Sequence, residues 1–173
     1  MKQKKKYGDS EKLEYTYYES PIGRLLIAGC GESLRLISFP QGSGICRPLP
    51  GWLQAEKPFV EAIRQLRAYF ARDLRRFDLP LLPHGTHFQL AVWLELQRIP
   101  YGETVTYREL AQRIGNPKGF RAVGAANGRN PLPIVIPCHR VIGSNGHLTG
   151  FGGGLSVKQM LLDLENGRNP QRP

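Results

Sequence analysis

Long apolar runs are absent from this 173-residue sequence. No stretch approaches the ~20 consecutive apolar residues that a membrane-spanning helix needs. The lysine-rich start is not followed by an apolar run, so a secretory signal peptide is not predicted. We therefore expect a soluble, cytoplasmic protein that does not act in a membrane.

Cysteine is scarce, occurring only as Cys30, Cys46 and Cys138, and no C-x-x-C pair is present. An odd number of widely spaced cysteines argues against a disulfide framework and against a cysteine-rich zinc site. The four histidines form no ligand pattern with them. We therefore expect a reducing compartment and neither a metal ion nor a cofactor.

Acidic residues are also few. The chain has 14 Asp and Glu against 24 Lys and Arg, a formal net charge of +10. Such an excess favours a polyanionic partner, either nucleic acid or an anionic membrane surface, although it also fits a protein that is simply soluble. The lysine-rich residues 1–10 by themselves predict a solvated, disordered tail.

The first half of the chain has the pattern of a small sheet with one helix. Three β-favouring segments are followed by a loop rich in Gly and Pro, and then by apolar residues at helical spacing. These are the strand segments 12–19, 24–30 and 33–39, the loop 40–51 and the helical segment 58–72.

The second half carries clear signals for helix starts. Thr86 and Thr106 each stand three residues before a Gln or Glu, which is the pattern of a capping box. Asn116 is a good N-cap for the next helix, and Pro117 a good first helical residue. A last helix is expected over residues 155–165.

These patterns predict an α+β protein of two domains, joined by the Pro-containing linker 78–85. Residues 1–83 would form the small strand-plus-helix domain. Residues 84–173 would form a mostly helical domain that contains a helix-turn-helix and a loop carrying Cys138.

The two helices that meet at Gly115 have lengths typical of a helix-turn-helix. The second of them, over residues 118–127, is poor in side chains that read bases and rich in Gly and Ala. Small residues let a helix backbone approach a narrow surface, which suits the minor groove of DNA. The same face could equally pack on another helix, and the pattern alone does not decide.

A short apolar run, residues 134–136, leads into Pro137 and Cys138. The run should be buried, so the thiol should emerge at the edge of the core. A lone cysteine is usually a small hydrophobic residue. Here His139 and Arg140 follow directly, and a thiol near cations or a histidine loses its proton more easily. Because adjacent residues cannot share one strand face, either the backbone turns here or His139 reaches Cys138 through water.

The motif P-C-H-R-V at residues 137–141 resembles the active-site signature of the O6-alkylguanine-DNA alkyltransferases. The resemblance is strong over about residues 86–166 and weaker around the turn at residues 20–23. Further matching segments are residues 101–107, 115–118, 121–124, 130–131 and 153–155, together with Glu165.

The resemblance implies DNA repair by direct damage reversal. The alkyl group of O6-alkylguanine would move irreversibly to the protein, one lesion per molecule. The sequence does not decide whether O4-alkylthymine is a substrate as well. The resemblance implies that Cys138 is the nucleophile, that His139 is a base acting through water, and that Glu165 orients His139. It also implies that Asn130 connects the turns around the active site by hydrogen bonds and that Tyr107 donates a hydrogen bond to the guanine ring.

The resemblance also implies how the substrate is held. The backbone carbonyls of Cys138 and Val141 would accept hydrogen bonds from the guanine amino group, and the N–H of Gly152 would stabilise O6. Phe151 would form an aromatic wall where many members have Tyr. The base would have to be flipped out of the duplex, and Arg121 would fill the vacated stack.

A monomer that binds double-stranded DNA through the minor groove is implied as well. The DNA-contacting residues would be Lys118, Arg121, Ala122, Gly124 and Ala125. Some members hold a zinc ion in the N-terminal domain, but this chain has Arg35 where a histidine ligand would stand. The resemblance therefore implies no metal here.

Two other functions are weighed against this one. A papain-type Cys-His hydrolase needs an oxyanion hole, and its Cys and His lie far apart in sequence, unlike Cys138 and His139. A non-catalytic DNA-binding module would be either a regulator or a lesion sensor. A regulator needs a base-reading helix, which is not evident, and a sensor lacks the reactive cysteine, which is present.

Overall fold

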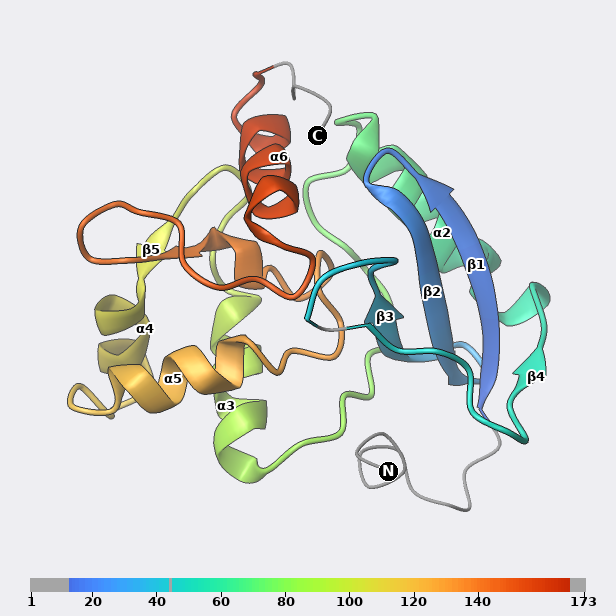
Figure 1. The fold of residues 1–173 in the computed structure, drawn as a ribbon, viewed down its shortest axis with the longest axis horizontal. Coiled ribbons are helices and arrows are strands. Elements are labelled where there is room, and N and C mark those ends of the chain that lie inside the picture. Colours follow the sequence, from blue (N-terminus) through green and yellow to red (C-terminus); the bar gives the residue numbers. More distant parts are fainter. Residues whose placement is uncertain (1–12, 44, 169–173) are drawn as a thin grey trace.

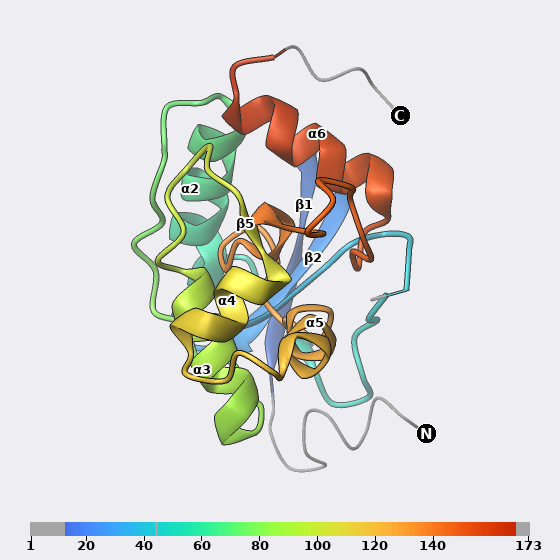
Figure 2. The same ribbon diagram turned by 90° about the vertical axis from the view of Figure 1, so that its left-hand side faces the viewer.

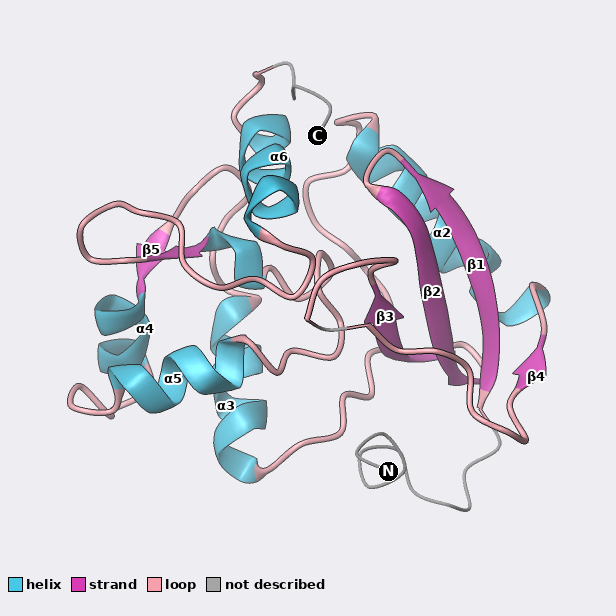
Figure 3. Cartoon of the chain, in the orientation of Figure 1, coloured by secondary structure: helices cyan, strands magenta, loops and turns pink. Residues whose placement is uncertain are grey.

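The computed structural model describes residues 13–43 and 45–168, so the tail predicted over residues 1–10 lies outside them. A sheet with one helix forms the N-terminal half, and short helices dominate the C-terminal half (Figures 1 and 3). The N-terminal elements are β1 (Glu14–Ser20), β2 (Gly23–Cys30), β3 (Ser33–Ser38), β4 (Leu53–Gln54), η1 (Lys57–Phe59) and α2 (Val60–Phe70). The C-terminal elements are α3 (His87–Leu96), β5 (Val105–Thr106), α4 (Tyr107–Arg113), α5 (Phe120–Asn127), η2 (Cys138–Arg140), β6 (Val141–Ile142) and α6 (Leu155–Glu165). The predicted α+β class is confirmed.

The sheet has the strand order β3-β2-β1-β4, with β1, β2 and β3 antiparallel and β4 parallel to β1. Buried side chains lie on both faces of the sheet, because alternate side chains of a strand point to opposite sides. On β2, Leu25 and Ile27 join the main core, whereas Leu26 and Ala28 join a smaller cluster. The three predicted strands are confirmed. Strand β4 was not predicted, since two residues are too few to show an alternating pattern.

Helix α2 packs an apolar stripe against the main core. Leu66 and Tyr69 lie fully buried on that stripe. The predicted helical segment 58–72 is shorter in the structure, because η1 forms a separate turn before α2 and because Arg72 adopts a positive φ of 68°, which a right-handed helix does not allow.

Both predicted capping boxes are present. Thr86 and Thr106 each accept a hydrogen bond from the backbone N–H three residues on, and the reciprocal side-chain bond is also made. These caps fix where α3 and α4 begin.

The predicted start of the next helix is wrong. Asn116 and Pro117 do not cap it, since α5 begins at Phe120 with Gly119 as its N-cap. The Gly119 N–H donates to the Asn116 carbonyl (2.9 Å), and the Asn116 side chain lies so close to Gly119 that a Cβ there would be 2.3 Å from Nδ2. The asparagine therefore closes its own turn and leaves the helix uncapped.

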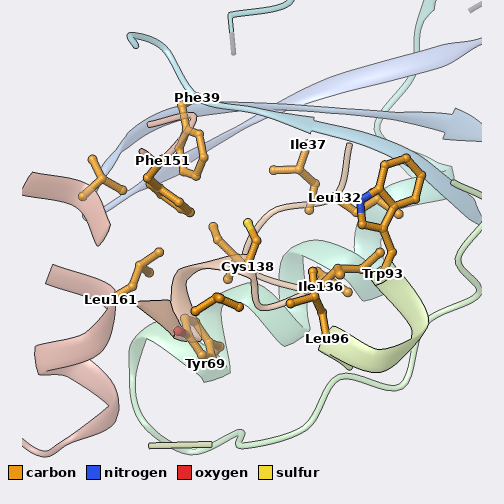
Figure 4. Close-up of a cluster of buried hydrophobic side chains, with 14 of the residues drawn as sticks. Ile37, Phe39, Tyr69, Trp93, Leu96, Leu132, Ile136, Cys138, Phe151 and Leu161 are labelled. Carbon is orange, nitrogen blue, oxygen red and sulfur yellow. The ribbon is translucent and has the colours of Figure 1, made fainter. Parts of the chain in front are cut away.

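One large hydrophobic cluster runs through both halves. It joins Leu25 of the sheet and Tyr69 of α2 to Leu96 of α3 and to Ile136 and Cys138 (Figure 4). The turned view shows α4 and α5 side by side at one end and α6 at the other (Figure 2). The domain boundary after residue 83 stays a prediction. Within residues 13–43 and 45–168, no helix combines the length and apolar character that crossing a membrane requires.

Candidate active site

Cys138 follows a loop that the Asn130 side chain holds by two hydrogen bonds. The Asn130 amide donates to the carbonyl of Ile136 (2.7 Å), while its oxygen accepts from the N–H of Leu132 (3.0 Å). Between these points Ile134 has a φ of 76°, which is a rare conformation for a β-branched residue. Residues 134–136 are buried, as predicted. The chain then turns into η2, so the backbone does turn at the Cys138–His139 step, one of the two arrangements predicted for it.

The Cys138 side chain borders a small cavity. Only 4% of the residue is exposed, and the sulfur points toward the side of the core where Ile37 and Phe151 lie (Figure 4). The inner cavity, of about 60 Å³, is lined by Cys138, Asn127, Asn130, Ile37, Phe39 and Phe151, among others. It shares Gly128, Gly150, Phe151 and Gly152 with an outer cavity of about 410 Å³.

The thiol of Cys138 is not pre-ionised in this setting. Burial raises its pKa to about 11, although the Asn130 amide and the charge of Lys158 act in the opposite direction. The sequence suggested that the cation of Arg140 lies beside the thiol. In the structure, its guanidinium bonds to Glu165 instead. Cys138 is thus a thiol at neutral pH, and its deprotonation requires a base.

The His139 ring is anchored at one of its two nitrogens. The ring is fully buried, and Nε2 lies 2.8 Å from Oε1 of Glu165, which is also fully buried. Burial lowers the pKa of His139, so the ring is neutral at pH 7. With Nε2–H donated to the carboxylate, Nδ1 is the nitrogen that can accept a proton, and it has no hydrogen-bond partner among the described residues.

Glu165, at the end of α6, collects several donors. The Arg140 guanidinium donates through Nε to Oε2 and through Nη2 to Oε1, both at 2.9 Å. The Tyr69 hydroxyl donates to Oε1 (2.7 Å), and the N–H of Gly102 donates to Oε2 (3.0 Å). Sequence reasoning identified Glu165 but missed Tyr69 and Gly102. Their chain positions are remote from Glu165, and no local pattern indicates the contact.

Lys158 was also missed. Its side chain is fully buried in α6, and Nζ donates to the carbonyls of Val141 (2.6 Å) and Thr149 (2.9 Å). Burial lowers its pKa to about 8. The ammonium therefore ties the strand that follows the cysteine to the loop that lines the outer cavity.

The outer cavity contains most of the residues predicted to hold the substrate. It is lined by Ser43, Tyr107, Phe120, Gly124, Gly128, Thr149, Gly150, Phe151 and Gly152. The Thr149 hydroxyl donates to the hydroxyl oxygen of Tyr107 (3.2 Å). A Cβ on Gly124 would lie 3.6 Å from the Tyr107 ring, so the helix backbone forms one edge of the cavity. The centroids of the Phe151 and Phe39 rings are 5.3 Å apart.

Helix α5 uses its two faces differently. Val123 and Ala126 are buried, whereas Arg121, Ala122 and Ala125 are exposed. Lys118 is exposed in the turn before the helix. One side of the helix therefore packs inward, and the other forms an open surface beside the cavity.

Comparisons with known proteins agree with these observations. A family model described as "6-O-methylguanine DNA methyltransferase, DNA binding domain" matches residues 87–167, and one described as "6-O-methylguanine DNA methyltransferase, ribonuclease-like domain" matches residues 13–83. The methylated-DNA–protein-cysteine methyltransferase of Methanosarcina acetivorans is 54% identical over 153 residues, covering 88% of this chain and 98% of that protein. Its counterpart from Haemophilus influenzae is 51% identical, covering 88% and 86%.

The fold agrees as well. A crystal structure of Mycobacterium tuberculosis OGT in complex with DNA superposes with a TM-score of 0.86 at 46% sequence identity, covering 92% of this chain and 96% of that one. Both halves are therefore matched in sequence and in structure, and the chain belongs to the 6-O-methylguanine DNA methyltransferase family.

Proposed function

We propose that this protein repairs DNA by transferring the alkyl group of O6-alkylguanine to Cys138, irreversibly and once per molecule. Family membership supports alkyl transfer from DNA to a cysteine. The observation that carries the choice of residue is the inner cavity, since Cys138 is the cysteine that lines it and the cavity adjoins a larger one beside α5.

The transfer is a single displacement. The thiol proton of Cys138 passes to Nδ1 of His139 through water, while Glu165 holds the ring by Nε2. The sulfur attacks the alkyl carbon, a C–S bond forms, and the C–O6 bond breaks with its electron pair left on guanine. The guanine then takes up a proton, so the sum of the reaction exchanges the thiol proton for the alkyl group.

The outer cavity would hold the extruded base. Its volume of about 410 Å³ lies within the usual range of small-molecule pockets. The Tyr107 hydroxyl would donate to the ring, the N–H of Gly152 would stabilise O6, and Phe151 would form the wall. Val141 is buried and does not line the outer cavity. Its carbonyl accepts a bond from Lys158 and would use its second lone pair for the guanine amino group.

Duplex DNA would bind through its minor groove to the open face of α5, with the protein acting as a monomer. Ala122, Ala125 and Gly124 permit close approach, and Lys118 would contact phosphate. A free thiol nucleophile needs a reducing compartment, which supports the cytoplasm as the place of action.

The function is tested by mass spectrometry of the intact protein. After incubation with a duplex containing one O6-methylguanine, the protein should gain the mass of one methylene, and peptide mapping should locate it on Cys138. A duplex of the same sequence with unmodified guanine is the control. No gain, or a gain on Cys30 or Cys46, would rule out the proposal.

Arg121→Ala should slow repair of duplex DNA by about 10- to 100-fold, because unstacking a base costs a few kcal/mol and each 1.4 kcal/mol is a factor of ten. Reaction with free O6-benzylguanine should be nearly unchanged, since no stack has to be opened. The matched control is Arg24→Ala, an exposed arginine on the sheet. Equal losses on duplex and free base would mean that Arg121 does not assist extrusion.

A further inference from the structure

One oxygen of Glu165 receives three side-chain donors. Oε1 is 2.8 Å from Nε2 of His139, 2.9 Å from Nη2 of Arg140 and 2.7 Å from the hydroxyl of Tyr69. Oε2 is bonded by Arg140 Nε and the Gly102 N–H instead. The Tyr69 hydroxyl therefore competes for the same oxygen that holds the His139 imidazole.

Tyr69 comes from the other half of the molecule. It lies on α2, 96 positions before Glu165 in the chain, and its ring is fully buried. The ring is fixed edge-on or tilted against three aromatic neighbours, Phe70, Phe77 and Tyr101, with centroids 5.3 to 6.1 Å away. Burial and the nearby Glu165 charge raise the pKa of Tyr69 well above its usual value, so the hydroxyl stays protonated and acts as a donor.

We propose that Tyr69 is a positioning residue that tunes the basicity of His139 through Glu165, so that the N-terminal half contributes directly to the active site. The inference rests on the proposed function. A carboxylate stabilises an imidazolium through the electron density that it offers to the ring N–H. Each further donor to the same oxygen withdraws some of that electron density, so Glu165 stabilises the protonated His139 ring less. Tyr69 thereby helps to keep His139 neutral and able to take the thiol proton.

The other charged and titratable groups around His139 and Glu165 are the same in the wild type and in a variant that changes only the Tyr69 hydroxyl. Arg140 of η2 and Lys158 of α6 act on His139, Tyr101 lies near Glu165, and Cys138 is the neighbouring residue. A change at the Tyr69 hydroxyl alters one donor while leaving these groups in place.

The test is Tyr69→Phe, which keeps the ring and removes the hydroxyl. The rate of single-turnover methyl transfer from an O6-methylguanine duplex should be measured from pH 5 to pH 9. Protonation of His139 sets the acid limb. Losing a donor to Oε1 strengthens the bond from Nε2–H, so the limb should move to higher pH by about half a unit to one unit. Tyr18→Phe, a second buried tyrosine, at the sheet, is the control and should leave the limb in place.

A substitution in the opposite direction covers the case in which Tyr69→Phe does not fold. Fluorotyrosine at position 69 retains the shape and donates more strongly, so the acid limb should move to lower pH. Superimposable profiles for the wild type and either Tyr69 substitution would show that the hydroxyl only fills space, and would overturn the inference. A wild type that forms no adduct on Cys138 would instead overturn the proposed function.

Discussion

A Cys138→Ala variant should gain no mass at all from a duplex containing O6-methylguanine, whereas the wild type gains one methylene. The reaction ends in a carbon–sulfur bond, and alanine offers no atom that could form it. The Asn130 bonds to the backbone of Ile136 and Leu132 do not involve the sulfur, so the variant should fold and should still bind DNA.

The other two cysteines provide the controls for this experiment. Cys30 is exposed at the end of β2, and Cys46 is buried in the small cluster on the far face of the sheet. Cys30→Ala and Cys46→Ala should both accept the methyl group at wild-type level. Methylation that persists in Cys138→Ala would mean that another nucleophile carries the activity.

Glu165→Gln should have the second largest effect, on stability as well as on rate. Burial alone would raise the pKa of Glu165, but the hydrogen bonds from His139 and Arg140 and the charge of Arg140 outweigh it and hold the pKa well below its usual value. The neutral amide would leave the buried Arg140 guanidinium without a counter-charge. Breaking a buried ion pair in this way costs about 3–5 kcal/mol of unfolding free energy. Because His139 also loses its orienting acceptor, methyl transfer should slow by about 100-fold or more.

Denaturant unfolding as a function of pH tests this directly. Since the folded pKa of Glu165 is depressed, its stabilisation is fully present above the unfolded value of 4.5 and is lost as the pH falls below it. The variant lacks this contribution and should show a flatter stability curve below about pH 4.5. Glu103→Gln, at an exposed glutamate, is the control. A Glu165→Gln protein as stable as the wild type would contradict the ion-pair argument.

Local sequence patterns predicted the parts of this molecule that depend on local chemistry. The capping residues Thr86 and Thr106 act within their own turn, so their spacing was sufficient. Strands β1 to β3 follow from β-favouring segments between turn signals, and α6 follows from its apolar residues. The prediction that Asn116 caps a helix was wrong because an asparagine can close a turn as readily as it caps a helix. Only the position of Gly119 beside the Asn116 side chain distinguishes the turn from the cap.

The remaining features depend on contacts between distant segments. Tyr69 occupies the apolar face of a helix, where the sequence indicates burial and nothing about the hydroxyl at the end of the side chain. Lys158 is a charged residue, and no local pattern indicates that it is buried. Arg140 was read as a neighbour of the thiol because it is close in sequence. In the structure η2 turns its guanidinium toward Glu165, which shows that adjacency along a chain does not give direction.

The backbone at Ile134 has a consequence for the energetics of the reaction. A β-branched residue at a φ of 76° is strained by about 1–3 kcal/mol, and the surrounding structure must supply that energy. It does so during folding, through the two Asn130 bonds and the buried side chains on either side. The nucleophile is therefore preorganised: its orientation is set before any DNA arrives, and the entropic cost of arranging it does not add to the activation barrier.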